Sequence, residues 1–211
     1  MAKNRYVGSY PVIGIRPIID GRRGPMKLRE SLESQVMAMA EAVKKLFEDT
    51  LYYSNGDHVK VVIADSTIGR VPESAACAEK FRREGVSITL SVTPCWCYGS
   101  ETMDMDPMTI KGVWGFNGTE RPGAVYLAAV MAAFAQRGLP AFSMYGHDVQ
   151  DIDDNTVPED VAEKMIRWAK GAVAVGQMKN KAYVNLGSVA MGIAGSYCDM
   201  SFMQKYLGIR A

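Results

Sequence analysis

Short apolar runs rich in β-branched residues alternate with longer segments of helical periodicity along most of this chain. Strands are predicted by the apolar runs at 12–19, 59–64, 86–92, 111–116 and 139–145. Helices are predicted where apolar positions recur at helical spacing, over 28–51, 72–84 and 124–136. Strands that alternate with helices pair in parallel through right-handed crossovers. The pattern therefore predicts an α/β fold, a Rossmann-like parallel sheet with helices on both faces.

The pattern changes near residue 150, where an acidic segment contains Asp148, Asp151, Asp153 and Asp154. Beyond it we expect a helix from about 158 to 178, a strand over 182–186, a glycine-rich stretch and a helix over 201–207. A single strand with flanking helices does not make a self-sufficient sheet domain. The expected organisation is a Rossmann-like domain over 1–150 and the beginning of a second, incomplete α/β domain over 151–211.

Composition and charge narrow the classes of partner. The 211 residues include 24 basic and 23 acidic side chains, for a formal net charge of +1. Proteins that bind nucleic acids normally carry a clear basic excess, so we expect no nucleic-acid partner. The polar N-terminus lacks the apolar core of a signal peptide, and no apolar run is long enough to cross a bilayer. We expect a cytoplasmic protein that has no membrane partner and binds a neutral or weakly charged small molecule.

The cysteines are too few and too irregularly spaced for a disulfide framework; they are Cys77, Cys95, Cys97 and Cys198. Cys95 and Cys97 flank a tryptophan in a predicted loop, where a reactive thiol would need a neighbouring base. His147 follows a strand at the same edge of the sheet, so a Cys–His pair is geometrically possible. Buried thiols that act as small hydrophobic groups are the favoured interpretation.

The segment after the third predicted strand, Thr93–Asp106 (TPCWCYGSETMDMD), is the richest in candidate chemistry. Open parallel sheets bind ligands beyond the carboxyl ends of their strands, where this segment lies. An aromatic face can stack on the C–H side of a sugar, and Trp96 and Tyr98 are placed to do so. Trp96 fits equally well as a side chain that fills the gap between the loop and the sheet.

Other polar groups near the strand ends also have both a functional and a purely structural interpretation. Glu101, Asp104 and Asp106 could hold Mg²⁺ or Mn²⁺, or could face solvent or cap a helix. Arg16 is a guanidinium within an apolar strand, so it must be paired or reach a ligand. The loop over 117–123 could bind an anion at the start of the next helix, although it lacks the dinucleotide-binding fingerprint.

Several long strings, taken together and in order, resemble the L-fucose isomerase family. Their chemistry is unusual enough that the resemblance is specific, and it covers almost the whole chain. The strings are IGIRPIIDGRR (Ile13–Arg23), VTPCWCYGSETMDMDP (Val92–Pro107), WGFNGTERPGAVYLAA (Trp114–Ala129), AFSMYGHDVQD (Ala141–Asp151) and SVAMGIAGS (Ser188–Ser196).

The resemblance implies a metal-dependent aldose–ketose isomerase that acts on L-fucose and D-arabinose, usually with Mn²⁺, and assembles as a homo-hexamer. In that family the open-chain sugar binds the metal through O1 and O2, and a carboxylate moves a proton between C1 and C2 through an ene-diolate. The metal ligands, two carboxylates and one histidine, belong to later domains of the family. The segments that carry them are absent here, so we expect neither metal ligands nor catalytic residues in this chain.

The resemblance implies a role in substrate recognition for residues of this chain. In the family, strand-end residues of the first, Rossmann-type domain reach into the active site of a neighbouring subunit. Arg16 and Trp96 match these positions. Further substrate-binding candidates in the adjoining loops are Tyr98, Glu101, Asn117, Glu120 and Arg121.

Three functions are compatible with these features. The leading hypothesis is the N-terminal portion of an L-fucose isomerase, which supplies recognition residues to a neighbouring subunit and is inactive alone. The second is a stand-alone sugar-binding module without catalysis. The third is a self-contained enzyme whose metal site is built from Glu101, Asp104, Asp106 and His147.

Overall fold

A five-stranded parallel sheet forms the centre of the computed structural model, which describes residues 10–25, 27–118, 121–184, 186–187 and 189–210. All neighbouring strands run parallel, in the order β2-β1-β3-β4-β5. This confirms the predicted α/β fold. The strands are β1 (Val12–Pro17), β2 (Val61–Ile63), β3 (Val86–Thr93), β4 (Ile110–Gly115) and β5 (Ala141–Tyr145).

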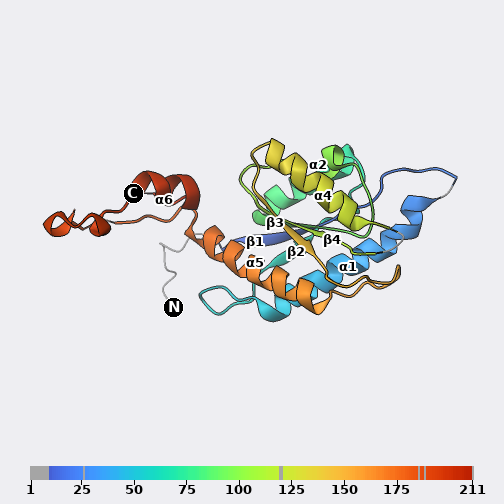
Figure 1. Cartoon of the computed structure of the whole chain (residues 1–211), viewed down its shortest axis with the longest axis horizontal. Helices are drawn as coiled ribbons and strands as arrows, with labels where there is room; N and C mark the ends of the chain where they lie inside the picture. The colour runs from blue at the N-terminus through green and yellow to red at the C-terminus, as the bar shows by residue number, and fades with distance from the viewer. Residues whose placement is uncertain (1–9, 26, 119–120, 185, 188, 211) are drawn as a thin grey trace.

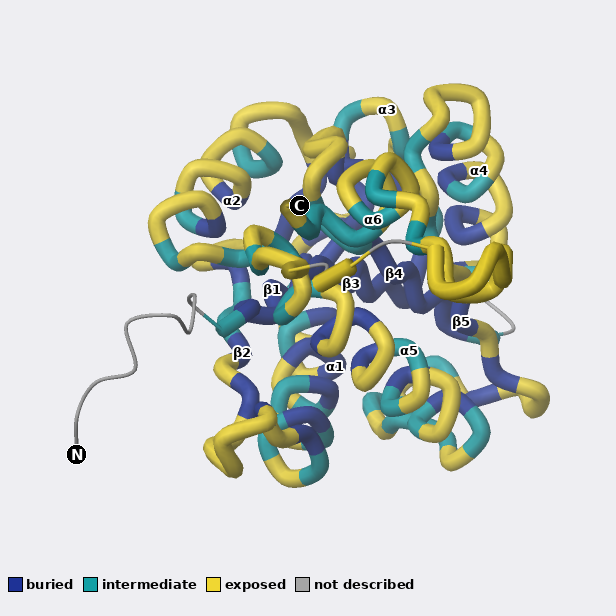
Figure 2. Tube along the Cα trace, turned by 90° about the vertical axis from the view of Figure 1, so that its left-hand side faces the viewer, coloured by how far each residue is buried: buried dark blue, intermediate teal, exposed yellow. Residues whose placement is uncertain are grey.

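Helices cover both faces of the sheet, as Figure 2 shows. One face is covered by α1 (Leu28–Thr50) and α5 (Glu159–Met178). The other carries α2 (Val71–Glu84), the four-residue α3 (Gly99–Thr102) and α4 (Gly123–Gln136). Among the described residues, no helix combines the length and the apolar character needed to span a membrane.

Two separate apolar cores result from the alternation of side chains along the strands. On β1, Ile13 and Ile15 point toward α1 and α5 and are fully buried. Gly14 lies between them on the other face, where a Cβ atom would come within 2.4 Å of the Phe81 ring on α2. Glycine is therefore needed at residue 14 because α2 packs directly on the backbone of β1.

The helix expected to open a second domain packs on this same sheet. Val161, Met165 and Ala169 of α5 are fully buried in the core that α5 shares with α1. The hydrophobic side of α5 is therefore satisfied by strands that precede residue 150. The domain division at residue 150 stays a prediction.

The segment after α5 extends away from the sheet (Figure 1) and contains η1 (Ala190–Gly192), η2 (Ala194–Ser196) and α6 (Met200–Leu207). The predicted final helix is confirmed. The strand predicted over 182–186 is wrong for the described residues of that range, where Ala182 forms only an isolated bridge with Arg210. A strand requires a continuous partner, and here pairing is limited to hydrogen bonds on either side of that bridge.

Candidate functional site

The site follows from the strand order. The chain moves outward from β1 to β2 and then returns to place β3 on the other side of β1, so the order reverses between β1 and β3. Loops that leave the carboxyl ends of two such strands diverge and leave room for a ligand. Here these ends are Pro17 and Thr93. We call the surface formed by residues 20–22 and 95–98 the strand-end site.

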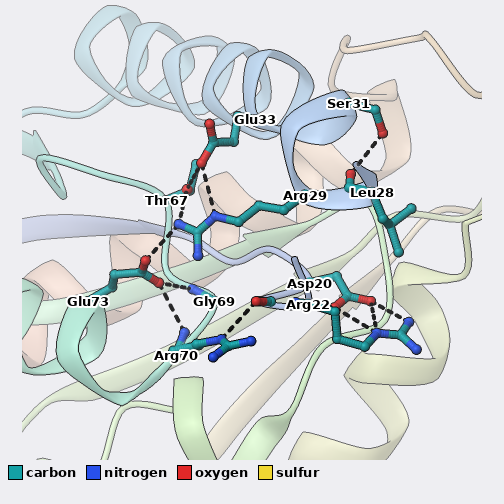
Figure 3. A network of polar contacts seen from close by, with 11 residues as sticks. Asp20, Arg22, Leu28, Arg29, Ser31, Glu33, Thr67, Gly69, Arg70 and Glu73 are labelled. Atoms are coloured by element: carbon teal, nitrogen blue, oxygen red, sulfur yellow. Dashed lines mark hydrogen bonds and ion pairs between the residues drawn. The ribbon is translucent and has the colours of Figure 1, made fainter. Parts of the chain in front are cut away.

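Asp20 and Arg22 form the first half of this site (Figure 3). Asp20 is buried, and its carboxylate accepts hydrogen bonds from the Arg22 backbone N–H at 2.9 Å and from side-chain Nε and Nη2 at 3.0 and 2.5 Å. Hydrogen bonding and charge from Asp20 raise the pKa of the Arg22 guanidinium. The Arg22 side chain is 57% exposed, so a guanidinium fixed by Asp20 faces the surface. Among the described residues Nη1 has no hydrogen-bond partner and could donate to a ligand.

The loop after β3 forms the second half. Cys95 lies in the core beneath α1 and α5, and Cys97 in the core beneath α2 and α4, so the loop closes both cores at the end of the sheet. Trp96 between them is partly buried against the second core, and Tyr98 is 41% exposed. Trp96 therefore both fills space and keeps part of its surface accessible.

Burial makes nucleophilic thiols unfavourable in this loop. It raises the pKa of Cys95 to about 11 and that of Cys97 well above its ordinary value. His147, the candidate base, is exposed and pairs with the Asp148 carboxylate at 2.8 Å. The structure therefore supports the interpretation of both thiols as buried hydrophobic groups.

Arg16 is placed beneath the loop rather than at the surface. It is 2% exposed, and its guanidinium donates to the carbonyl of Thr102 at 2.7 Å and to Ser74 Oγ at 3.2 Å. These contacts join β1 to α3 and α2. The direct sugar contact expected of Arg16 stays a prediction, while the observed contacts support the segment that carries Tyr98.

The acidic residues of the β3–β4 connection are engaged in local structure. Asp104 is buried and accepts hydrogen bonds from the hydroxyls of Thr89 at 2.7 Å and Thr109 at 2.6 Å. Burial raises the pKa of Asp104, but the charge of Arg16 and the two hydroxyls more than offset it and hold the pKa below its ordinary value.

These acids do not fit a metal site. The carboxylate of Asp106 caps the turn by accepting from the Met108 backbone N–H at 2.8 Å. Glu101 lies partly buried on α3, and His147 faces solvent. Across the part of the chain that the structure describes, no three histidine, cysteine or acidic side chains gather as metal ligands would.

The remaining candidates follow β4. Asn117 donates from Nδ2 to the carbonyls of Gly146 and Asp148, each at 3.1 Å, and accepts from the Tyr145 hydroxyl at 2.9 Å. It therefore ties the loop after β4 to the loop after β5. Arg121 is partly buried and close enough to Cys95 for its charge to affect that thiol. Glu120 lies outside the described residues.

A cavity of about 900 Å³ lies elsewhere, between α5, α6 and the amino ends of β3, β4 and β5. Its lining includes Ser87, Ile110 and Trp168, and none of the strand-end residues. The strand-end site is instead an open surface formed by two loops. Arg22 was not among the residues predicted from the sequence. The signal that could have revealed it is an acid two residues before an arginine, directly after a strand.

Comparison with known proteins gives consistent matches. The family model described as "L-fucose isomerase, first N-terminal domain" matches residues 10–180, and the second N-terminal domain of the same family matches 181–211. The chain is 66% identical to an L-fucose isomerase of Phocaeicola vulgatus over 201 residues, which is 95% of this chain and 34% of that protein. An L-fucose isomerase of Bacteroides thetaiotaomicron is 63% identical, with the same coverage of 95% and 34%. The corresponding Clostridium perfringens protein is 59% identical, covering 95% of this chain and 33% of its own length. The chain thus spans about one third of the length of these relatives.

Proposed function

The chain belongs to the L-fucose isomerase family, and on that premise we propose that it is the sugar-recognising N-terminal portion of an L-fucose isomerase. The parent enzyme interconverts L-fucose and L-fuculose, and also D-arabinose and D-ribulose, through an ene-diolate. This portion alone does not catalyse the reaction.

The observation that carries this proposal is the strand-end site at the point where the strand order reverses. Arg22 presents a guanidinium fixed by Asp20, and donors of this kind suit the hydroxyl groups of a sugar. Trp96 and Tyr98 provide aromatic surface on the adjacent loop, which can cover the C–H side of the same molecule. Together they would orient the sugar and exclude water from one side of it.

The metal centre belongs to the rest of the parent enzyme in this proposal. Mn²⁺ would be held by two carboxylates and a histidine outside this chain, and when bound it would polarise the sugar carbonyl as a Lewis acid. The acids described above are engaged in other contacts and do not supply this site. In a homo-hexamer, the strand-end site of one subunit would complete the centre of its neighbour.

Two measurements test the proposal. The purified 211-residue chain, supplied with Mn²⁺ and L-fucose, should form no ketose, while the complete parent enzyme should form L-fuculose. Turnover by the isolated chain would contradict the first expectation. In the parent enzyme, Trp96→Ala should raise KM for L-fucose by about fivefold, because an aromatic contact contributes about 1 kcal/mol. Trp168→Phe is the matched control, because Trp168 on α5 lines the cavity at the amino ends of the strands and is not part of the strand-end site.

The alternative is a stand-alone sugar-binding module, which the same loops could provide. Titration of the isolated chain with L-fucose or a non-reactive fucitol, followed by tryptophan fluorescence, distinguishes the two. A saturable change that disappears in Trp96→Phe favours the module. No response, combined with a raised KM of the Trp96→Ala parent enzyme, favours a site completed between subunits.

A further inference from the structure

The turn that carries Arg22 rests directly on the turn that precedes α2. At Gly21, a Cβ atom would come within 2.1 Å of the Gly69 carbonyl oxygen. At Gly69, a Cβ atom would come within 2.7 Å of Gly21 Cα. No side chain fits between the two turns, so the position of one backbone determines the position of the other.

Arg70 holds the peptide unit from which Arg22 extends (Figure 3). Its side-chain Nε donates to the carbonyl oxygen of Gly21 at 2.8 Å. That carbonyl belongs to the same planar peptide as the Arg22 N–H, which donates to Asp20 Oδ1 at 2.9 Å. One peptide plane is thus held at its carbonyl by Arg70 and at its N–H by Asp20, which fixes the direction in which the Arg22 side chain leaves the backbone.

Glu73 in turn fixes Arg70. Its carboxylate accepts from the backbone N–H groups of Gly69 at 2.8 Å and Arg70 at 3.1 Å, and pairs with Arg29 Nη2 at 2.8 Å. Arg29 is buried at the start of α1, where it also pairs with Glu33 at 3.1 Å. The turn before α2 is therefore anchored to both α1 and α2. Arg70 connects this anchored turn to the strand-end site through its hydrogen bond to the Gly21 carbonyl.

We propose that Arg70 is a positioning residue for sugar recognition: it touches no sugar, but orients Arg22 so that the exposed guanidinium of Arg22 meets the substrate hydroxyls. The inference rests on the proposed function. An exposed arginine loses rotamer and backbone freedom when it binds a ligand. Because Arg70 and Asp20 order this peptide beforehand, less freedom remains to be lost on binding.

A role limited to fold stability would leave a different signature. If Arg70 acts only through Arg22, removing Arg70 changes KM only in an enzyme that still has Arg22. If Arg70 merely stabilises the fold, its removal has the same effect on KM whether or not Arg22 is present. A double-mutant cycle separates the two because it measures the dependence of one substitution on the other.

The test uses the complete parent enzyme, with KM and kcat for L-fucose and the melting temperature as readouts. Arg70→Ala should raise KM roughly three- to tenfold and change kcat by less than about twofold, because orientation before binding is what is lost. Arg70→Lys, which keeps a donor able to reach the Gly21 carbonyl, should restore part of the loss. In an Arg22→Ala background, Arg70→Ala should change KM by less than about twofold.

Arg83→Ala is the matched control, since Arg83 is an exposed arginine at the other end of α2 whose guanidinium lies 3.9 Å from Glu79. An unchanged KM for Arg70→Ala, or the same change in both backgrounds, overturns the positioning role. A parent enzyme without L-fucose turnover would overturn the proposed function itself, and the inference with it. Normal turnover with additive substitutions overturns only the inference.

Discussion

The guanidinium of Arg16 in β1 donates to the carbonyl oxygen of Thr102, 86 positions later in the chain, at 2.7 Å. This contact ties the short helix α3 to the sheet and supports the loop that carries Trp96 and Tyr98. The charge of Arg16 also lowers the pKa of Asp104 in the same buried region. Arg16 is thus surrounded by groups that depend on its charge and on its hydrogen bonds.

Replacing Arg16 should therefore destabilise the fold. Arg16→Met removes the donor of the buried Thr102 carbonyl and the positive charge that favours the ionised Asp104, and we expect a loss of about 3 kcal/mol in the free energy of unfolding. Arg16→Lys should recover only part of the lost stability, because an ammonium cannot reproduce the planar arrangement of donors on a guanidinium. Urea unfolding of the chain measures both, with Arg83→Met as the control. Equal stability of Arg16→Met and the unaltered chain would contradict this account.

Gly14 is expected to be intolerant of a side chain. Gly14→Ala brings a methyl group within 2.4 Å of the Phe81 ring, which must move within a packed core. Overpacking of this kind costs about 1–3 kcal/mol. The double variant Gly14→Ala/Phe81→Leu should be more stable than the sum of its two single variants predicts. Additive losses in urea unfolding would show that the cost of Gly14→Ala does not arise from contact with the Phe81 ring.

The cysteines should differ sharply in reactivity. Burial raises the pKa values of Cys77 and Cys95 to about 11 and that of Cys97 well above its ordinary value, whereas Cys198 is only partly buried. At pH 8 a disulfide reagent should modify Cys198 rapidly in the folded chain and the other three only on unfolding. Cys198→Ser should remove the rapid phase. Rapid labelling of Cys95, identified by mass spectrometry, would contradict the buried placement of the loop.

Acid should weaken the fold through Asp104. Its pKa in the folded state lies below its ordinary value of 3.8, so the carboxylate adds stability above that value and loses it as the pH falls through the lower one. The difference in unfolding free energy between the unaltered chain and Asp104→Asn should be largest near pH 6 and shrink by pH 3. Urea unfolding at both pH values measures it. A difference that stays constant would show that Asp104 is not held in its charged form.

Much of the fold could be predicted from the sequence because its signals are local. Buried parallel strands are nearly continuous apolar runs, and the helices between them keep one apolar side. The helix α3 was missed because four residues are too few to show periodicity. The strand predicted over 182–186 failed because a strand depends on a neighbour that the local pattern does not reveal.

The candidate site was harder to predict because it depends on the direction of single side chains. The sequence marked Arg16 as an arginine within an apolar strand but could not show that it points inward to Thr102. Arg22 looked like an ordinary turn residue, since its contact with Asp20 depends on the path of the chain beyond β1. Whether Arg16, Trp96 or their neighbours contact a sugar stays a prediction.

The strand order also determines when the strand-end site can assemble during folding. Ile13 in β1 pairs with Val61 on one side and with Ile88 on the other, and both partners lie far along the chain. Such non-local pairing is slow, because the entropy of closing long loops is lost before the contacts form. The loop with Arg22 and the loop with Trp96 come together only when β1 and β3 are paired. Sugar-binding competence should consequently appear late in refolding, with the last kinetic phase of the central sheet.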